Sequence, residues 1–555
     1  MRRSPTEIPH NQALIRTSTL STRIPRIALG QYSIVAALVL LGAVLRFHRL
    51  GEWSFWVDEV FQVQDSLAMD TVGEAVSAYY PLSYLLMRPA LVGLGLNEWS
   101  ARLVPAILGI IAIPLMYFGA NAVLGRRIAI LSAALLAISP WHLYWSQNAR
   151  FYSLLLLLYS ASLLLFYLGI EKDRFRLILL SFLFWLLALA THPTAILLLP
   201  TFVLYFAALK VVPIEKPAGL RYRYIIPITV VPLLIYVAYD GYRIVFAGKT
   251  SIFLAFVQTF VGYPNLTAFS ILGSILYRVG MPLALLALFG GVLMLVLGVR
   301  LGLLLGFAAA LPILSVMAMS SFTYTAFRYA FVTLPSFILL GAYFAVQWSK
   351  SPKRTWTLVA FVGALALVLS QDYVLEDAGY YLGAAWRWAP LIAVALLAVV
   401  ALAWSVQLKL RGPDNNRRDD KVGSSLWMTG LLVPVLLHPL LANGLYFTFQ
   451  NGYRDDWKAA ASAVVPNLNQ GDLVLSTLPR LADYYLGEGT KQIEAVDPKA
   501  ELSNGTRLWI VEDWGIYKFF GWAEDWMYQN CELTGTFDNF AGGRNFQFRT
   551  HLCEP

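Results

Sequence analysis

Charged residues are scarce in this chain. Asp, Glu, Lys and Arg make up 14% of its 555 residues, whereas 58% are hydrophobic. An average soluble domain is about a quarter charged, so the composition excludes a soluble globular protein of this length. About 20 apolar residues span a membrane as a helix, and only helices satisfy their backbone hydrogen bonds within one apolar run. The composition therefore predicts an α-helical polytopic membrane protein.

Nucleotide-binding and metalloprotease signatures are also missing. The sequence holds no Walker-type loop, no dinucleotide-binding Gly-x-Gly-x-x-Gly, no HExxH and no short-period repeat. The loops predicted to be cytoplasmic are too short for a nucleotide-binding domain, which disfavours an ATP-driven pump.

Cysteine is nearly absent. The only two, Cys531 and Cys553, lie close to the C-terminus. Two cysteines confined to one exported domain suggest a disulfide formed in an oxidising compartment. Two free buried thiols are the alternative, and the spacing fits no zinc motif.

Basic residues mark the start of the chain. Residues 1–30 contain five arginines and one acid, which predicts a cytoplasmic basic arm and a first helix that stays as a signal anchor. A transmembrane domain over residues 31–442 follows, with about 13 helices. We expect them at Tyr32–Leu45, Ala101–Leu124, Ile128–His142, Phe151–Ile170, Leu177–Ala190, Pro193–Lys210, Tyr224–Tyr239, Met281–Val299, Leu301–Met319, Tyr329–Gln347, Trp356–Ser370, Pro390–Val406 and Leu426–Leu441.

The segment Tyr79–Leu96 is apolar enough to span but contains Pro81, Arg88 and Pro89. If it does not cross, the inner arm and loops hold 23 basic residues and the outer loops of the membrane domain hold 10. A crossing would reverse the side of every later loop. We therefore expect an amphipathic helix on the outer surface, within a first outer loop over residues 46–100.

The character of the chain changes after Leu441. Residues 443–555 alternate strand-like and helical segments, which predicts a small soluble α/β domain. This part holds 9 basic residues against 15 acids. If the N-terminus is cytoplasmic and the chain crosses the membrane thirteen times, this domain lies on the extracytoplasmic side. The membrane is predicted to be the plasma or inner membrane of the cell.

Two adjacent carboxylates stand out in the first outer loop. Asp58 and Glu59 follow the aromatic run Trp53-Ser54-Phe55-Trp56-Val57. Aromatic residues are enriched at membrane interfaces, so the acids are predicted to lie there rather than in open water. Ionisable groups at a membrane often mark function or a specific pair, whereas a solvated loop is the alternative.

Further polar residues fall on the predicted outer side, while the helix centres are apolar. A transporter more often places such groups near the bilayer centre. The pattern predicts a cavity open at the outer leaflet. Arg150 is a strong candidate for a functional residue of this cavity, because it lies at the start of a very apolar helix that needs no cation for its stability. Structural roles remain open for the others: an Arg102 pair with Glu98, a helix cap at His142, a turn at His192, and an interfacial anchor at Arg328 and Tyr329.

A carboxylate with arginines at a lipid interface suits sugar transfer from a lipid-linked phosphate. Arginine presents a planar donor fork that matches phosphate. The reaction needs one general base for the acceptor hydroxyl. It needs no separate acid, in contrast to glycosidases, because phosphate leaves as a stable anion. Arginine stabilises the charge that develops on that phosphate.

With these residues in view, the chain resembles bacterial membrane glycosyltransferases of the GT-C class. The resemblance is strongest to the family-39 group related to protein O-mannosyltransferases and the aminoarabinose transferase of lipid A. The similar elements occur in the same order: Trp56-Val57-Asp58-Glu59; Tyr80-Pro81-Leu82-Ser83-Tyr84, with Tyr80 where proline is usual; Glu98 and Arg102; Ser139-Pro140 and Gln147-Asn148-Ala149-Arg150-Phe151-Tyr152; Phe327-Arg328-Tyr329 and Pro335; and Tyr453-Arg454-Asp455-Asp456-Trp457-Lys458.

The resemblance implies a GT-C fold and inverting transfer from a polyprenyl-phosphate sugar, with Asp58 as catalytic base and Glu59 assisting. No obligatory metal is predicted, because a strict Asp-x-Asp motif is missing and the second outer loop has no clear acid. We expect Arg150, Arg328, Tyr329 and Arg102 near the donor phosphate, and Tyr80, Glu98, His142, Gln147, Tyr152 and His192 in the substrate cavity.

The leading hypothesis is a glycosyltransferase whose partners are membrane lipids, the lipid-linked donor and a lipid, glycan or protein acceptor, with no nucleic acid. A transporter or flippase of lipid-linked sugars is one alternative. An oligosaccharide polymerase or ligase that uses pyrophosphate-linked donors is another.

Overall fold

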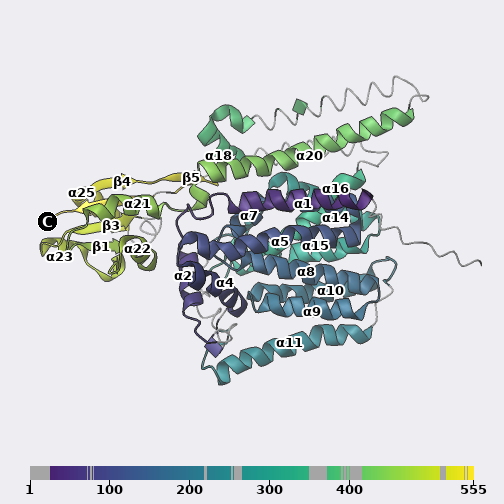
Figure 1. Ribbon diagram of the computed structural model, residues 1–555, viewed down its shortest axis with the longest axis horizontal. Coiled ribbons are helices and arrows are strands. Elements are labelled where there is room, and N and C mark those ends of the chain that lie inside the picture. Colours follow the sequence, from purple (N-terminus) through teal and green to yellow (C-terminus); the bar gives the residue numbers. More distant parts are fainter. Residues whose placement is uncertain are drawn as a thin grey trace, which may run out of the picture.

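The computed structural model describes most of the chain: residues 26–217, 222–251, 266–348, 372–388, 416–512 and 521–555, except 72, 75–77, 79, 543 and 547, together with the isolated positions 254, 392, 395, 396 and 399. Helices that run side by side form a bundle, and the C-terminal domain lies beyond one end of it (Figure 1). The helices of the membrane part are α1 (Arg26–Phe47), α2 (Val57–Leu67), α4 (Pro81–Leu94), α5 (Glu98–Leu124), α6 (Arg126–Ile138), α7 (Pro140–Ser146), α8 (Tyr152–Glu171), α9 (Phe175–Leu189), η1 (Pro193–Leu197), α10 (Leu198–Val211), α11 (Tyr222–Val245), α13 (Ala268–Val279), α14 (Met281–Val296), α15 (Arg300–Met319), η2 (Phe327–Thr333), α16 (Leu334–Trp348), α18 (Tyr373–Leu382) and α20 (Asn416–Thr448).

Long apolar helices make this a multi-pass membrane protein. Among the described residues, five helices are long and apolar enough to cross a membrane, and seven spans result if each of two bent pairs counts as one. The predicted number of about 13 remains a prediction, because Trp356–Ser370 lies outside the described residues and Pro390–Val406 and the basic arm lie largely outside them.

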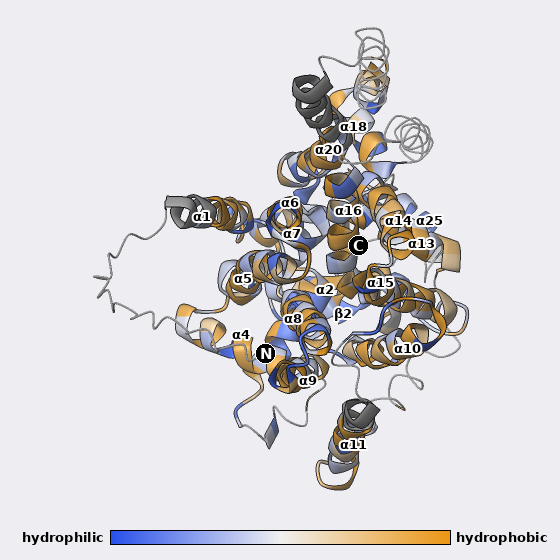
Figure 2. Cartoon of the chain, turned by 90° about the vertical axis from the view of Figure 1, so that its right-hand side faces the viewer, coloured by the Kyte–Doolittle hydropathy of each residue, from blue (hydrophilic) through white to orange (hydrophobic). Residues whose placement is uncertain are grey.

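Helix α8 lies inside the bundle, where Figure 2 shows it end-on among α5, α9 and α15. Its sequence is apolar all round, as expected of a helix covered on every side. Small residues bring α8 close to α9, since a Cβ added at Gly169 would lie 2.6 Å from Ile178. The hydroxyls of Ser162 and Ser181 also meet at 3.2 Å across this contact.

Two pairs of consecutive helices in the bundle meet at sharp breaks. Helices α6 and α7 meet at 56°, and α13 and α14 meet at 97°. The single helix expected at Ile128–His142 is therefore broken, because Pro140 has no N–H to continue the ladder. The carbonyls freed at the end of α6 bind Arg46, whose guanidinium donates to Leu136 at 3.3 Å and Ala137 at 3.0 Å.

In the described residues of the first loop, the short helices α2 and α4 lie at the end of the bundle that is nearer the C-terminal domain (Figure 1). Helix α4 covers most of the predicted segment Tyr79–Leu96, of which Tyr79 is outside the described residues. Its 14 residues are too few to span the membrane. It packs on α2, and the hydroxyl of Tyr84 donates to Asp65 at 3.0 Å.

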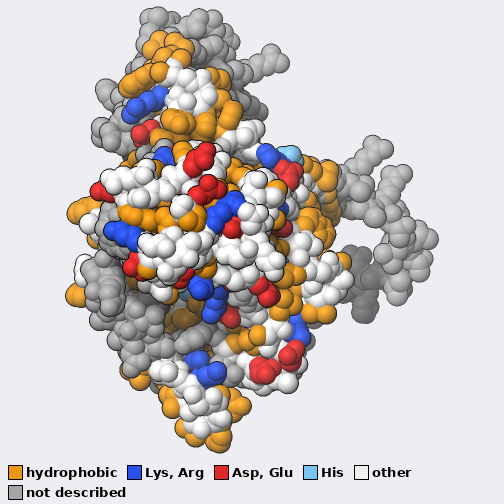
Figure 3. Space-filling model, turned by 90° about the vertical axis from the view of Figure 1, so that its left-hand side faces the viewer, with side chains coloured by type: hydrophobic (Ala, Val, Ile, Leu, Met, Phe, Trp, Pro, Cys, Tyr) orange, Lys and Arg blue, Asp and Glu red, His pale blue; other side chains and the backbone are white. Residues whose placement is uncertain are grey.

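The C-terminal domain is a mixed α/β unit. A five-stranded sheet has the order β2-β1-β3-β7-β4, with parallel pairing of β1 to β2 and β3 and antiparallel pairing of β7 to β3 and β4. A disulfide joins Cys531 to Cys553. Acidic and basic side chains are interspersed over the face turned away from the bundle (Figure 3). The elements are η4 (Asn451–Tyr453), α21 (Trp457–Val464), η5 (Val465–Asn467), β1 (Leu473–Ser476), α22 (Pro479–Leu486), β2 (Lys491–Gln492), η6 (Ile493–Ala495), α23 (Pro498–Ser503), β3 (Leu508–Glu512), α25 (Gly521–Asn530), β4 (Glu532–Thr536), β5 (Asn539–Ala541), β6 (Arg544–Phe546) and β7 (Arg549–Cys553).

Candidate active site

Asp58, in the first turn of α2, lies between two arginines. Its Oδ2 is 3.6 Å from Nη2 of Arg150 and 3.4 Å from Nη2 of Arg328. Arg150 also donates to the backbone carbonyl of Asp58 at 3.0 Å. The side chains of Asp58, Arg150 and Arg328 retain 21%, 11% and 19% exposure, so all three are partly exposed. Three segments far apart in the sequence thus combine one carboxylate with two cations.

Aromatic rings frame these charges. His192 lies against four rings at centroid distances between 4.4 and 6.2 Å, those of Phe151, Tyr80, Tyr329 and Tyr152. Such walls lower the local dielectric, which strengthens the attraction between an arginine and a bound anion. The structure therefore brings Tyr80, Tyr152, His192 and Tyr329 together around Asp58, Arg150 and Arg328.

The frame is uncharged near neutral pH. Burial, together with the positive charges of Arg150 and Arg328, lowers the pKa of His192 to about 3. The backbone N–H of Thr194 donates to His192 Nδ1 at 3.2 Å, so the hydrogen of the neutral ring lies on Nε2. Burial raises the pKa of Tyr80 to about 12. Asp58 and the two arginines therefore carry the charge of this site.

Glu59 occupies a different environment from its neighbour. Its carboxylate is 0% exposed and accepts two hydrogen bonds from Arg102 at 2.8 Å each and one from the N–H of Ala149 at 2.7 Å. Arg454 Nε lies 3.4 Å from the same carboxylate. Burial favours the protonated form, but the two arginines and these hydrogen bonds lower the pKa of Glu59 below its usual value. Direct contact of this enclosed carboxylate with a substrate does not fit the geometry, whereas its predicted assisting role stays a prediction.

Arg102 likewise has no donor left for a phosphate. Besides Glu59, its guanidinium donates to the carbonyls of Leu50 at 3.1 Å, Trp53 at 2.8 Å and Ser54 at 2.9 Å. It is 0% exposed. The start of α5 directs this side chain into the first loop, so the predicted role at the donor phosphate does not fit the geometry.

Three more predicted cavity residues make structural contacts. Glu98 accepts a hydrogen bond from the hydroxyl of Tyr485 at 2.8 Å. Gln147 donates to the backbone carbonyls around the end of α1 at 2.7 to 3.2 Å. His142 Nδ1 lies 2.6 Å from a guanidinium nitrogen of Arg46. Their hydrogen bonds link the first loop, the bundle and the C-terminal domain. The three residues are not part of the cluster around Asp58.

One arginine near the site was not among the predicted site residues. The guanidinium of Arg278 lies 4.4 Å from the ring centroid of Tyr453, and 5.3 to 5.6 Å from those of Tyr144, Tyr277 and Phe327. Phe327 directly precedes Arg328, so this cation lies beside the cluster. No carboxylate lies within ion-pair distance of Arg278 in the part of the chain that the structure describes. The sequence places Arg278 among the polar residues of the predicted outer side but gives no signal that assigns it a role.

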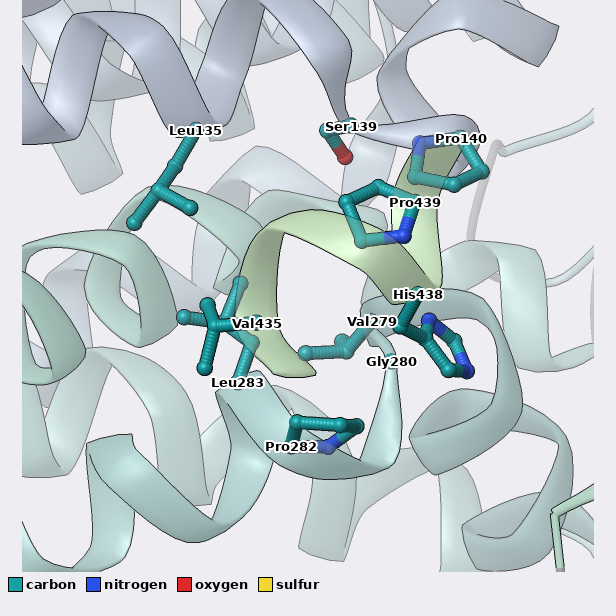
Figure 4. A pocket seen from close by; sticks show the side chains of 10 residues that line it. All are labelled: Leu135, Ser139, Pro140, Val279, Gly280, Pro282, Leu283, Val435, His438 and Pro439. Atoms are coloured by element: carbon teal, nitrogen blue, oxygen red, sulfur yellow. The ribbon is translucent and has the colours of Figure 1, made fainter. Parts of the chain in front are cut away.

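A separate cavity lies where the broken helices meet α20 (Figure 4). It shares no residue with the Asp58 cluster. The lining is mainly apolar, and its one titratable side chain is His438, whose Nε2 lies 2.7 Å from Asp372. The lining contains no arginine or lysine that could bind a phosphate. The residues are Leu135, Ser139, Pro140, Val279, Gly280, Pro282, Leu283, Val435, His438 and Pro439.

Metal-binding groups do not gather in the described ranges, where no three His, Cys, Asp or Glu side chains lie close enough to hold an ion. The expectation that no metal is obligatory remains a prediction.

Comparisons with known proteins agree on the fold. Residues 81–236, less than a third of the chain, match the family model described as dolichyl-phosphate-mannose-protein mannosyltransferase. A comparison with curated protein sequences found no match.

Among solved structures, ArnT from Cupriavidus metallidurans bound to undecaprenyl phosphate matches with a TM-score of 0.58 and 17% identity, over 95% of this chain and 98% of ArnT. The oligosaccharyltransferase AglB from Archaeoglobus fulgidus, in complex with an inhibitory peptide and a dolichol-phosphate, matches with a TM-score of 0.51 and 10% identity. That match covers 88% of this chain and 70% of AglB. The likeness confirms the GT-C class that the sequence resembles, at the level of the fold.

Proposed function

We propose that this chain, which has the GT-C fold of ArnT and AglB, is an inverting glycosyltransferase. It moves a sugar from a polyprenyl-phosphate donor to a hydroxyl acceptor at the extracytoplasmic face of a cell membrane. One observation carries the proposal: a single partly exposed carboxylate, Asp58, lies between Arg150 and Arg328 within a neutral aromatic frame. The lipid phosphates in the ArnT and AglB structures support the donor class.

In the proposed reaction, Asp58 removes the proton from the acceptor hydroxyl. The acceptor oxygen attacks the anomeric carbon of the donor sugar from the face opposite the phosphate. The bond from that carbon to the phosphate oxygen breaks, and its electron pair stays on the phosphate. The new glycosidic bond has inverted configuration, and the proton remains on Asp58 until solvent takes it.

Arg150 and Arg328 hold the departing phosphate in this scheme. Their side chains are 11% and 19% exposed, and neither Nε has a hydrogen-bond partner within the described residues. Charge-assisted bonds from arginine to phosphate are strong and directional. These interactions strengthen as negative charge builds on the leaving oxygen, which lowers the barrier. The acceptor belongs to the lipid, glycan or protein hydroxyls that reach this face.

The decisive experiment is a transfer assay on the purified protein in detergent, with a polyprenyl-phosphate sugar as donor. Asp58→Asn should lower kcat by about 10²- to 10⁴-fold, the usual contribution of a general base. Asp70→Asn is the matched control, because Asp70 is 75% exposed and pairs with Arg88 instead. Transfer by Asp58→Asn at the wild-type rate would disprove the proposal.

The same assay separates the alternatives. A flippase gives no glycosylated product even with the wild-type protein. A polymerase or ligase turns over pyrophosphate-linked donors in preference to monophosphate-linked ones. For the proposed enzyme, Arg150→Gln and Arg328→Gln should each weaken turnover of the monophosphate donor.

A further inference from the structure

We propose that Arg454, from the segment that opens the C-terminal domain, is a positioning residue for the catalytic pair Asp58 and Arg150. The inference rests on the proposed function and assigns part of the C-terminal domain to the site. Arg454 does not contact the proposed reacting atoms. It acts on the two segments that carry Asp58 and Arg150.

The contacts of Arg454 join those two segments. Its Nε lies 3.4 Å from Glu59, which directly follows Asp58. Its Nη2 donates to the backbone carbonyl of Gln147 at 2.8 Å. Glu59 in turn accepts the N–H of Ala149, the residue before Arg150, at 2.7 Å. Arg454 thus closes a buried ring of contacts around the start of α2 and the loop that precedes α8.

The backbone before Arg454 is shaped to insert this side chain. Asn451, Gly452 and Tyr453 have φ values of 42°, 60° and 57°, all in the left-handed region. Two of the three are not glycine, and such a conformation persists only where the surroundings enforce it. A Cβ added at Gly452 would lie 2.8 Å from both the Trp53 ring and Arg454 Nη1. The turn therefore needs glycine to bring Arg454 against the first loop.

Burial distinguishes Arg454 from an ordinary tether between domains. Its side chain is 0% exposed and faces a carboxylate that is also 0% exposed. Lys458, four residues later, makes a comparable link, with bonds from Nζ to the carbonyls of Gly51 at 2.9 Å and Glu52 at 3.1 Å. Lys458 is 38% exposed and contacts neither Glu59 nor the loop before α8. It provides a matched control on the same domain contact.

The test compares Arg454→Gln, Arg454→Lys and Lys458→Gln in the full-length protein. Arg454→Gln should lower kcat by roughly 10- to 100-fold, the range expected when reacting groups shift by about 1 Å. The KM for the donor should rise less than in Arg150→Gln, because Arg454→Gln shifts the segment that carries Arg150 but removes neither phosphate-binding guanidinium. Arg454→Lys, which keeps the charge, should recover part of kcat. Lys458→Gln should keep the wild-type kcat.

Hydrogen–deuterium exchange supplies a readout that does not depend on turnover. Peptides that cover residues 56–62 and 147–152 should exchange faster in Arg454→Gln than in Lys458→Gln. If the wild-type protein transfers no sugar but this difference appears, the proposed function fails and the positioning of the two segments stands. Wild-type kcat and exchange in folded Arg454→Gln would overturn the inference. If that variant does not fold, Arg454→Lys decides, and a kcat equal to wild type then overturns it.

Discussion

At the scale of single residues, the adjacent acids Asp58 and Glu59 show how neighbours acquire different chemistry. Consecutive positions in the first turn of a helix point in directions about 100° apart. Asp58 faces the partly exposed arginines, whereas Glu59 faces Arg102, Arg454 and the N–H of Ala149. The Asp58 carboxylate remains partly exposed, whereas the Glu59 carboxylate is enclosed and links the first loop to its neighbours.

This difference predicts a pH-dependent stability for Glu59→Gln. At pH 7 the substitution leaves two buried guanidiniums without their anion, which should cost about 3 to 5 kcal/mol of unfolding free energy. The pKa of Glu59 is lowered in the folded protein. The interaction of the Glu59 carboxylate with the two arginines therefore makes its full contribution to stability above the pKa of the unfolded state, near 4.5. This contribution is lost as the pH falls through the lower pKa of the folded state. Melting temperatures in detergent should differ most at neutral pH and converge only below pH 4.5.

Asp70→Asn is the control for this measurement, since Asp70 belongs to an exposed pair and such pairs contribute little. A difference between wild type and Glu59→Gln that already vanishes between pH 7 and pH 5 would contradict a lowered pKa for Glu59.

The sequence could identify this pair of acids but could not separate their roles. Asp58-Glu59 is visible because charges are rare in the chain. The partners that bury Glu59 lie 43 and 395 residues away, at Arg102 and Arg454. Helix periodicity carries no information on such contacts. The same limit applies to Arg102, because the sequence does not show that its guanidinium donates to Glu59 and to carbonyls of the first loop.

At the scale of elements, the helix breaks show which local signals are readable. Pro140 predicts an interruption, yet the apolar residues on both sides made Ile128–His142 resemble one span. Helix α13 was not predicted, because its Ser, Tyr and Arg residues interrupt the apolar pattern. Arg278 of α13 lies among aromatic rings beside the candidate site, so a helix that hydropathy did not identify contributes a neighbour of that site.

The break between α13 and α14 predicts a specific cost for Gly280→Ala. Gly280 has a φ of +91°, and an added Cβ would lie 3.1 Å from Nδ1 of His438. Gly298→Ala is the matched control, since its φ is +66° but nothing lies within 4 Å of the new Cβ. A side chain in a positive-φ conformation costs roughly 1 to 3 kcal/mol in both variants. Thermal unfolding should show a larger loss for Gly280→Ala, which adds the contact with His438.

His438→Ala in the Gly280→Ala background should recover that additional loss, because it removes the contacting ring. Equal melting temperatures for Gly280→Ala and Gly298→Ala would show that packing of His438 in α20 against Gly280 does not limit the side chain at the break between α13 and α14.

At the scale of the whole molecule, the composition predicts the bundle and the change of character near residue 443 predicts the separate C-terminal unit. The docking of that unit could not be predicted. It depends on contacts of single side chains, such as Tyr485 with Glu98 and Arg454 with Glu59, whose partners lie hundreds of residues away in the sequence. The candidate site therefore shares its supporting contacts between both parts of the chain.

The Asp58 cluster and the C-terminal domain lie at the same end of the bundle. Labelling of the C-terminal domain can therefore test the prediction that this end faces the extracytoplasmic side of the membrane. The two native cysteines are joined in a disulfide, so a single introduced cysteine is the reactive thiol. Ser462→Cys reports on the exposed surface of the C-terminal domain. Lys172→Cys reports on the opposite end, because α8 runs 20 residues, about 30 Å, from Tyr152 to Glu171.

A membrane-impermeant maleimide added to intact cells with an accessible outer face should label Ser462→Cys and leave Lys172→Cys unlabelled until the membrane is permeabilised. The physical reason is the excess of basic residues in the loops at the Lys172 end, which retains them in the cytoplasm. The reverse labelling pattern would put Asp58 on the cytoplasmic side. It would then remove the extracytoplasmic reaction from the proposed function, while the contacts within the site would be unaffected.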